Sequence, residues 1–379
     1  MTATFGRHGT FRGWDRFDYV LVIAALALVG YGLALIYSGS ISTGEGSFRS
    51  INSPVTKQIV FAIAGVAGML IVSRIDYHYF IHYAWILYAL SVLSLIAVLF
   101  IGTEAGGSTR WFDLGPIQVQ PSEFAKLATI FALARFFSDH GGDAREVKAL
   151  FISLAIVIPS VILVFVEPDL GTSVVFLGIW LGVVLVAGVS RRHLLILMAT
   201  GIAILPFAWT FALADYQLER FDVLVNPEQD PLDAGYNVIQ SQIAVGSGGM
   251  FGKGLTNGEQ TNLGYLKVPT KDFIFSVLGE ELGFVGAMGL FLLFIILLFR
   301  GIRAAEIAGD PAGQLIAVGI VLLILTQTFI NVAVNVSLFP VTGIPLPFVS
   351  QGGSSLVSLF GSLGVLQSIV MRHRAYRQA

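Results

Sequence analysis

Ten stretches of apolar residues, each long enough to cross a lipid bilayer, dominate this chain of 379 residues. They lie at 18–38, 56–73, 82–102, 121–138, 149–166, 172–189, 193–213, 273–299, 312–334 and 353–371. An α-helix spans the hydrocarbon core with about 20 residues, so each stretch is interpreted as one transmembrane helix. The sequence therefore predicts an all-α integral membrane protein that forms a single domain over residues 1–379.

The composition agrees with a membrane protein and excludes several other classes. The chain is 55% hydrophobic and 12% charged, whereas soluble domains carry about 25% charged residues. A net charge of −2 gives no electrostatic basis for binding nucleic acid. The absence of cysteine excludes disulfides and thiolate ligands, and the six histidines lack metal-ligand spacing such as HExxH. No metal site built by the protein is predicted.

The Lys and Arg residues of the short loops predict the orientation in the membrane. An even number of helices places both termini on one side, and that side holds fourteen of these cations against three on the other. The three are Arg49, Lys57 and Arg110. Since loops rich in Lys and Arg stay in the cytoplasm, both termini are expected to be cytoplasmic.

One long loop, about 214–272, connects the seventh and eighth helices on the outer side. Loops of this length are usually functional or disordered. The stretch 237–244 has apolar residues at helical spacing, and 245–258 contains six glycines, which favour turns or a close backbone approach. We therefore expect this loop to be partly ordered.

An acidic residue, Asp272, stands where this loop becomes the eighth helix. Glu280 and Glu281 follow about 12–13 Å further along that helix, at a rise of about 1.5 Å per residue. One interpretation makes Asp272 a helix N-terminal carboxylate that the macrodipole stabilises. The other makes it a general base on the outer face, with a pKa that nearby Lys271 or Lys267 lowers and desolvation raises.

A second group of candidate residues lies in Thr109–Lys126, around the start of the fourth helix. Glu123 and Lys126 are three residues apart on one helix face, so a local ion pair is expected. Alternatively, Arg110 and Lys126 line an anion site near Asp272. Arg110 beside an interfacial Trp is also typical of simple membrane anchoring.

Two outer turns complete the set of candidates. Asp169, in the turn 167–172, either caps the sixth helix or supports the same outer cavity. The uncharged segment 335–355 contains three prolines and three glycines, so it is either an outer turn or a loop that lines a cavity at membrane depth. Its end opens the last helix, whose N–H groups could face a phosphate. The candidates there are Ser350, Gly352, Gly353 and Ser354.

Together these segments resemble the SEDS family (shape, elongation, division and sporulation), in family order and across the whole chain. The matching stretches are RWFDLGPIQVQPSEFAK (110–126), EPDLGTS (167–173), NPEQDPLDAGYNVIQSQIAVGSGGMFGKG (226–254), KDFIFSVLGEELGFVG (271–286) and PVTGIPLPFVSQGGSS (340–355). The third and fourth are more similar to the rod-shape subfamily, RodA, than to the division subfamily, FtsW. One departure is the run Val268–Asp272, where family members commonly have Glu-x-His-Thr-Asp. Any role of that histidine is absent here or taken by Lys271.

The resemblance implies a peptidoglycan glycosyltransferase that polymerises lipid II on the outer face of the cytoplasmic (inner) membrane. It implies that Asp272 is the essential aspartate, with Arg110, Glu123 and Lys126 as further motif residues. In this mechanism Asp272 removes the acceptor proton and the donor inverts, which gives a β-1,4 bond. Arg110, Lys126 and Arg220 are candidates to stabilise the leaving pyrophosphate, with or without a divalent cation such as Mg or Mn. Asp169, Glu280 and Glu281 are expected to be supporting residues.

Two other functions are compatible with the sequence. Ten helices with buried ions could instead transport lipid II across the bilayer, as a flippase does. The chain could also be a non-catalytic scaffold for a transpeptidase. The resemblance further implies a partner, a class B penicillin-binding protein, and a place in the elongation machinery.

Overall fold

The computed structural model describes residues 13–41, 53–105, 108–115, 117–140, 146–211, 215–230, 234–266 and 268–376. All ten apolar stretches contain a helix. These are α1 (Tyr19–Ile41), α2 (Pro54–Arg74), α4 (Ala84–Ile101), α5 (Pro121–Asp139), α6 (Val147–Val166), α7 (Leu170–Val186), α8 (Arg191–Phe211), α12 (Ile274–Ile307), α13 (Pro311–Asn335) and α14 (Gly353–Tyr376). In the described part of the chain, seven of them are long and apolar enough to cross a membrane, and α7 is apolar but has 17 residues. The protein is a multi-pass membrane protein, while ten crossings remain a prediction.

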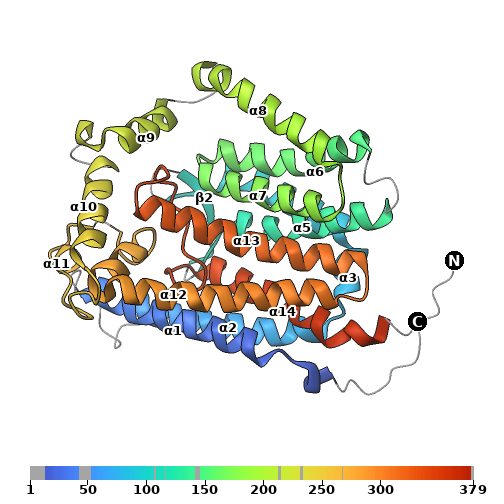
Figure 1. The fold of residues 1–379 in the computed structure, drawn as a ribbon, viewed down its shortest axis with the longest axis horizontal. Coiled ribbons are helices and arrows are strands. Elements are labelled where there is room, and N and C mark those ends of the chain that lie inside the picture. The colour runs from blue at the N-terminus through green and yellow to red at the C-terminus, as the bar shows by residue number, and fades with distance from the viewer. Residues whose placement is uncertain are drawn as a thin grey trace.

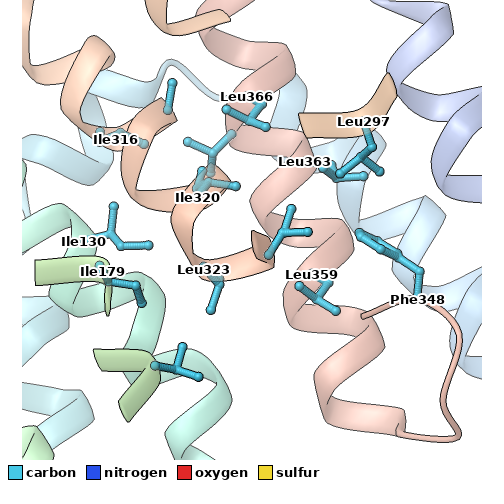
Figure 2. Packing of buried hydrophobic residues seen from close by; sticks show 14 of the residues in the cluster. Ile130, Ile179, Leu297, Ile316, Ile320, Leu323, Phe348, Leu359, Leu363 and Leu366 are labelled. Atoms are coloured by element: carbon cyan, nitrogen blue, oxygen red, sulfur yellow. The ribbon is translucent and has the colours of Figure 1, made fainter. Parts of the chain in front are cut away.

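The helices lie side by side, with α13 and α14 in the interior (Figure 1). α14 packs along α2, and α13 packs between α12, α7 and α5. Figure 2 shows Ile320 and Leu323 of α13 near Ile130 of α5 and Ile179 of α7. Gly319 allows this approach, since a Cβ atom there would lie 2.6 Å from the Cγ2 atom of Ile130.

The outer surface of the helix bundle is apolar, as expected for a protein in lipid. Large apolar side chains are exposed on most of the outer helices, for example Ile63 of α2, Phe100 of α4, Phe151 of α6 and Phe299 of α12. Because soluble proteins rarely leave such contiguous apolar surface uncovered, this surface is consistent with contact to acyl chains.

The two described ends of the chain meet on one side of the bundle. Asp18, just before α1, exchanges two backbone–side-chain hydrogen bonds with Gln367 of α14, at 2.9 and 2.8 Å. The carboxylate of Asp18 also pairs with Arg300 of α12 at 2.6 Å. α9, α10 and α11 lie at the opposite end of the molecule (Figure 1).

Several short elements were not anticipated from the sequence. A three-stranded antiparallel sheet follows α4, with β1 (Thr103–Ala105), β2 (Ser108–Asp113) and β3 (Gln118–Val119). Gly115 turns the chain between β2 and β3 with a φ of 86°. A short helix, α3 (Tyr77–His82), and a 3-10 turn, η1 (Gly13–Arg16), are the other additions.

The long outer loop is ordered in its described parts, as expected. It contains α9 (Asp215–Val225), η3 (Pro227–Gln229), α10 (Ala234–Ser247) and α11 (Glu259–Asn262). The helical spacing at 237–244 correctly predicted α10, and turns occupy 248–258. Residues 212–214, 231–233 and 267 lie outside the described residues, so the contribution of Lys267 expected above is not described.

A break in α12 anchors the glycine-rich part of this loop. Gly283 has φ 63° and ψ −160°, which interrupts the helical hydrogen bonds. The carbonyls of Glu280 and Glu281 instead accept from the N–H groups of Lys253 and Gly254, at 3.0 and 2.9 Å. The N–H groups of Phe284 and Val285 donate to the carbonyls of Gly249 and Met250, at 2.9 and 3.0 Å. The loop therefore provides partners for four backbone groups beside the break.

We expect Gly252→Ala to destabilise the protein by more than about 1 kcal/mol, because its backbone cannot accept a side chain. Gly252 has a φ of 75°, and a Cβ atom there would lie 2.1 Å from the carbonyl oxygen of Glu281. Thermal unfolding in detergent would measure the loss. Gly68→Ala in α2 is the matched control, since no atom lies within 4 Å of its Cβ position. Equal unfolding temperatures for the two variants would contradict this account.

Candidate functional site

Asp272 lies in the turn that precedes α12 and is held there through its backbone. Its carbonyl oxygen accepts hydrogen bonds from the amide groups of Asn331 and Asn335, at 3.1 and 2.9 Å. These residues are four apart and therefore on one face of α13. The Oδ1 atom of Asn335 also accepts from the N–H and hydroxyl groups of Ser276, at 3.0 and 2.6 Å. Two asparagines thus fix the head of α12 to α13.

The segment 336–352 forms the second wall around Asp272. The hydroxyl group of Ser350 donates to the carbonyl of Lys271 at 2.6 Å, and the N–H of Gln351 donates to the carbonyl of Thr270 at 2.9 Å. Gly343 brings the segment close to the carboxylate, since a Cβ atom there would lie 3.8 Å from Oδ2 of Asp272. Its φ of 74° favours glycine at this position.

The part of this segment from 344 to 350 is mostly buried, and the cavity-lining interpretation stays a prediction. Ile344, Leu346, Phe348 and Val349 are each at most 3% exposed. Gln58 of α2 holds the end of the segment, because its side chain donates to the carbonyl of Ser350 at 3.1 Å and accepts from the N–H of Gly352 at 3.3 Å. The backbone of a non-helical segment is therefore satisfied by protein groups, which is the condition for placing it inside a bundle.

Burial and charge act in opposite directions on Asp272. Burial is the largest effect and raises the pKa of its carboxyl group, and Asp169 raises it further. The positive charges of Lys271, Arg110 and Arg220 lower that pKa, in decreasing order. The net result is a pKa above the ordinary aspartate value, so that Asp272 is a stronger base than an exposed aspartate.

The three cations come from separate parts of the chain. Arg110 projects from β2, Arg220 from α9, and Lys271 precedes Asp272 directly and is exposed. Arg220 is positioned by a hydrogen bond from Nη1 to the carbonyl of Val341, at 3.1 Å. The sheet, the outer loop and the head of α12 thus bring positive charge to one carboxylate.

Arg110 connects this cluster to the start of α7. Its Nη1 atom lies 3.3 Å from Oδ2 of Asp169, and its Nη2 donates to the carbonyl of Pro168 at 3.1 Å. Asp169 caps α7 as expected, because Oδ1 accepts from the N–H of Thr172 at 2.9 Å. Through the ion pair Asp169 also positions Arg110. The same carboxylate therefore caps α7 and holds one of the cations that act on Asp272.

Glu123 and Lys126 form a buried ion pair inside the bundle. The Nζ atom of Lys126 lies 2.8 Å from Oε1 of Glu123, and the two side chains are 0% and 3% exposed. The carbonyl of Glu123 accepts from the hydroxyl of Ser358 at 2.9 Å, which joins α5 to α14. The expected local pair is therefore present, while substrate binding by these two residues stays a prediction.

Glu280 and Glu281 face the outer loop. Glu280 is buried and its carboxylate accepts from Nζ of Lys253 at 3.1 Å, from the N–H of Gln260 at 2.9 Å, and from both the N–H and the hydroxyl of Thr261. Glu281 accepts from the hydroxyl group of Ser38 of α1. The contacts of Glu280 hold 253–261 against α12, and the contact of Glu281 joins α12 to α1. A supporting role of the two residues stays a prediction.

The residues at the start of α14 are positioned by neighbouring segments. The N–H of Gln120 donates to the hydroxyl of Ser354 at 3.4 Å. A Cβ atom on Gly353 would lie 2.6 Å from the ring of Phe61, so glycine is required for packing. A role of Ser350, Gly352, Gly353 and Ser354 with phosphate remains a prediction.

Comparisons with known proteins identify the family. Residues 19–375 match the FtsW/RodA/SpoVE family of cell cycle proteins. The chain belongs to this family. Stage V sporulation protein E of Bacillus subtilis is 38% identical over 93% of this chain and 96% of its own length. Peptidoglycan glycosyltransferase MrdB of Escherichia coli K12 is 36% identical over 94% of each chain.

Two solved structures of family members share the fold. A chain of a peptidoglycan synthase complex that coordinates polymerization and crosslinking has a TM-score of 0.80 and 31% identity, and covers 97% of this chain and 100% of its own. The Thermus thermophilus rod shape determining protein RodA has a TM-score of 0.69 and 27% identity, with 97% and 99% covered. Probable FtsW glycosyltransferases are also similar, one at 35% identity over 93% of each chain. The similarity extends to the sporulation, rod-shape and division members alike.

Several residues at the site were missed by the sequence reasoning. Asn331, Asn335, Gly343 and Gln58 hold or border Asp272 and its walls. Polar amides in an apolar membrane helix are a usable signal, because such groups are costly unless they bond inside the bundle. The glycine gives no comparable signal, since 42 glycines occur in the chain.

Among the described residues, no three His, Asp or Glu side chains gather in a way that could hold a metal ion. The carboxylate of Asp169 is engaged in a helix cap and an ion pair. A divalent cation that arrives with a pyrophosphate remains a hypothesis.

The Glu123–Lys126 pair offers a test of its structural contribution. Lys126→Ala leaves a buried carboxylate without its cation, which should cost about 3–5 kcal/mol. The double variant Glu123→Leu/Lys126→Met replaces both charges by apolar groups and should recover most of that loss. Thermal unfolding of the single and double variants measures both effects. A double variant as unstable as Lys126→Ala would show that the pair does more than neutralise itself.

Proposed function

We propose that this protein is a peptidoglycan glycosyltransferase that polymerises lipid II on the outer face of the cytoplasmic membrane. The observation that carries the proposal is a single partly exposed carboxylate, Asp272, with a raised pKa and three cations acting on it. Membership of a family whose members include named peptidoglycan glycosyltransferases supports the same activity. These relatives favour polymerisation over transport.

In the proposed reaction Asp272 acts as the general base. It accepts the proton of the 4-hydroxyl group of the incoming lipid II while that oxygen attacks the anomeric carbon of the growing strand. The bond from this carbon to the pyrophosphate breaks, and inversion of the α-linked donor gives a β-1,4 bond. Base catalysis of this kind contributes about 10²–10⁴-fold. The raised pKa suits the role, because a base works best when its pKa approaches the operating pH.

The departing polyprenyl pyrophosphate needs positive charge as the bond breaks. Arg110 and Arg220 are the candidates that the cluster supplies, with Lys271 at its exposed edge. Fixed cations stabilise the charge of a leaving group most when they are positioned in advance. Asp169 and Val341 provide that positioning for Arg110 and Arg220 respectively.

The cellular setting follows from the family and remains part of the proposal. We infer an inner-membrane location with both termini in the cytoplasm and a role in cell elongation and shape; a division-type role of the same activity is the alternative. One similar chain belongs to a peptidoglycan synthase complex. A class B penicillin-binding protein, a transpeptidase, is therefore the proposed partner.

Asp272→Asn tests the base directly. The variant keeps the shape and the backbone contacts of Asp272, so it should fold, but it cannot accept a proton. We expect polymerisation of lipid II by the purified variant to fall at least about 10²-fold. Gel separation of the glycan products measures the activity, and thermal unfolding checks the fold. Polymer close to the wild-type amount would refute the assignment, whereas a dye-labelled lipid II that moves across vesicles without elongation would favour transport.

Lys271→Gln tests how the neighbouring cation tunes this base. The positive charge of Lys271 lowers the pKa of Asp272, so its removal should raise that pKa further. Because the base must be deprotonated, the acid limb of the pH–rate profile should move to higher pH in the variant. Lys148→Gln, in the first turn of α6, is the matched control and should not move the limb. An unchanged profile for Lys271→Gln would exclude this tuning.

A further inference from the structure

Glu167 is a buried acid beside the site that the proposed mechanism does not use. It follows the last residue of α6 and is 1% exposed. Neither of its carboxyl oxygens has a hydrogen-bond partner among the described residues. An ionised carboxylate without partners is costly in such surroundings, whereas the protonated form avoids most of that cost.

The charged groups that act on Glu167 are those of the Arg110–Asp169 pair. Asp169 lies two residues away on the same turn, and Arg110 reaches this turn from β2. The Nε atom of Arg110 is itself buried and has no hydrogen-bond partner among the described residues. The guanidinium group of Arg110, which acts on Asp272, therefore also acts on the paired carboxylate of Asp169 and on the unpaired carboxyl group of Glu167.

Among the described residues, the other charged groups of the helices packed against α6 are paired or lie at the other end of the helix from Glu167. α4 and α7 carry no charged side chain, and the charged residues of α5 form two pairs, Glu123–Lys126 and Arg135–Asp139. The charged residues of α8 stand in its first turn, which follows the end of α7 that is distant from Glu167. Lys148 lies in the first turn of α6, at the opposite end from Glu167. The protonation of Glu167 therefore depends on its burial and on the Arg110–Asp169 pair.

We propose that Glu167 is a positioning residue that stays protonated during turnover, so that Arg110 keeps its positive charge available to an anionic, pyrophosphate-bearing substrate. This inference rests on the proposed function. Ionisation of Glu167 would add a second negative charge next to Arg110, in addition to Asp169. The attraction of the cluster for a pyrophosphate would then decrease.

The expected titration range supports this reading. The pKa of Glu167 is raised to about 8, mainly by burial and also by the negative charge of Asp169, while Arg110 opposes the rise. The folded protein therefore holds a proton that the unfolded chain releases near its ordinary value of 4.5. Since the folded state binds more protons in this window, stability should decrease as pH rises from about 4.5 to about 8.

Binding and spectroscopy test the inference without relying on turnover. The probe is a polyprenyl pyrophosphate titrated into purified full-length protein between pH 6 and pH 9. For the wild type we expect affinity to weaken about tenfold as Glu167 ionises, the effect of one charge at about 10 Å and an effective dielectric constant of about 20. In Glu167→Gln, which cannot ionise at this position, the affinity for the probe should not show this tenfold decrease. Any change in affinity that comes from protonation of the probe's own phosphates is the same for both proteins and cancels in the comparison.

Infrared spectra of the wild type give the protonation state directly. The carbonyl band of a protonated carboxylic acid should be present at pH 7, titrate away near pH 8, and be reduced in Glu167→Gln. Glu146→Gln, at the N-terminal end of the same helix, is the matched control and should keep the band and the activity. The unfolding temperature of Glu167→Gln should decrease less than that of the wild type between about pH 4.5 and about pH 8.

The outcomes separate this inference from the proposed function. Identical pH dependence of binding in wild type and Glu167→Gln, or no protonated band assigned to Glu167, would overturn the inference and leave the glycosyltransferase proposal intact. Wild-type protein that binds the probe with the expected pH dependence but does not polymerise lipid II would overturn the proposed function alone. If Glu167→Gln does not fold, the titration of the wild-type band still decides the protonation state.

Discussion

Backbone polar groups that leave a helix inside a membrane protein must find partners in protein, and the arrangement around Asp272 depends on this requirement. At Gly283 the glycine-rich loop supplies the missing hydrogen bonds. At 336–352 the partners are Gln58 and the residues that precede α12. The head of α12 lies between these two places. The position of the head of α12 is therefore fixed from both sides by hydrogen bonds to backbone groups. These contacts do not involve the carboxylate of Asp272.

The helices could be predicted from the sequence because the length of an apolar stretch is a strong signal in a membrane protein. The end of α12 was predicted at 299 but lies at Ile307, since Arg300 stays helical and pairs with Asp18. The small sheet after α4 was missed because its strands have two to six residues. Strands this short form because they pair with each other in the folded protein, and the sequence pattern does not show which segments pair.

Site residues could be predicted where the residue type is unusual for its position in the sequence. They could not be predicted where the role of a residue depends on which residues surround it in space. Asp272 and Asp169 stood out as acids at helix boundaries, and both lie in one electrostatic cluster. Glu280 and Glu281 are equally unusual, yet the carboxylate of Glu280 binds the outer loop and that of Glu281 binds Ser38 of α1. Asn331 and Asn335 required knowledge that α13 faces the head of α12.

The location of Asp272, the proposed base, just outside a membrane helix has a physical reason. Within the hydrocarbon region a carboxylate would be neutral or paired, as Lys126 and Glu123 are paired inside the bundle. In bulk water it would be too weak a base and would have no preorganised cations beside it. In the turn before α12, Asp272 is buried enough for its pKa to rise, while Lys271, Arg110 and Arg220 limit that rise. A substrate with a lipid tail and a polar, anionic head presents its reacting bond at this same boundary, where both environments are within reach.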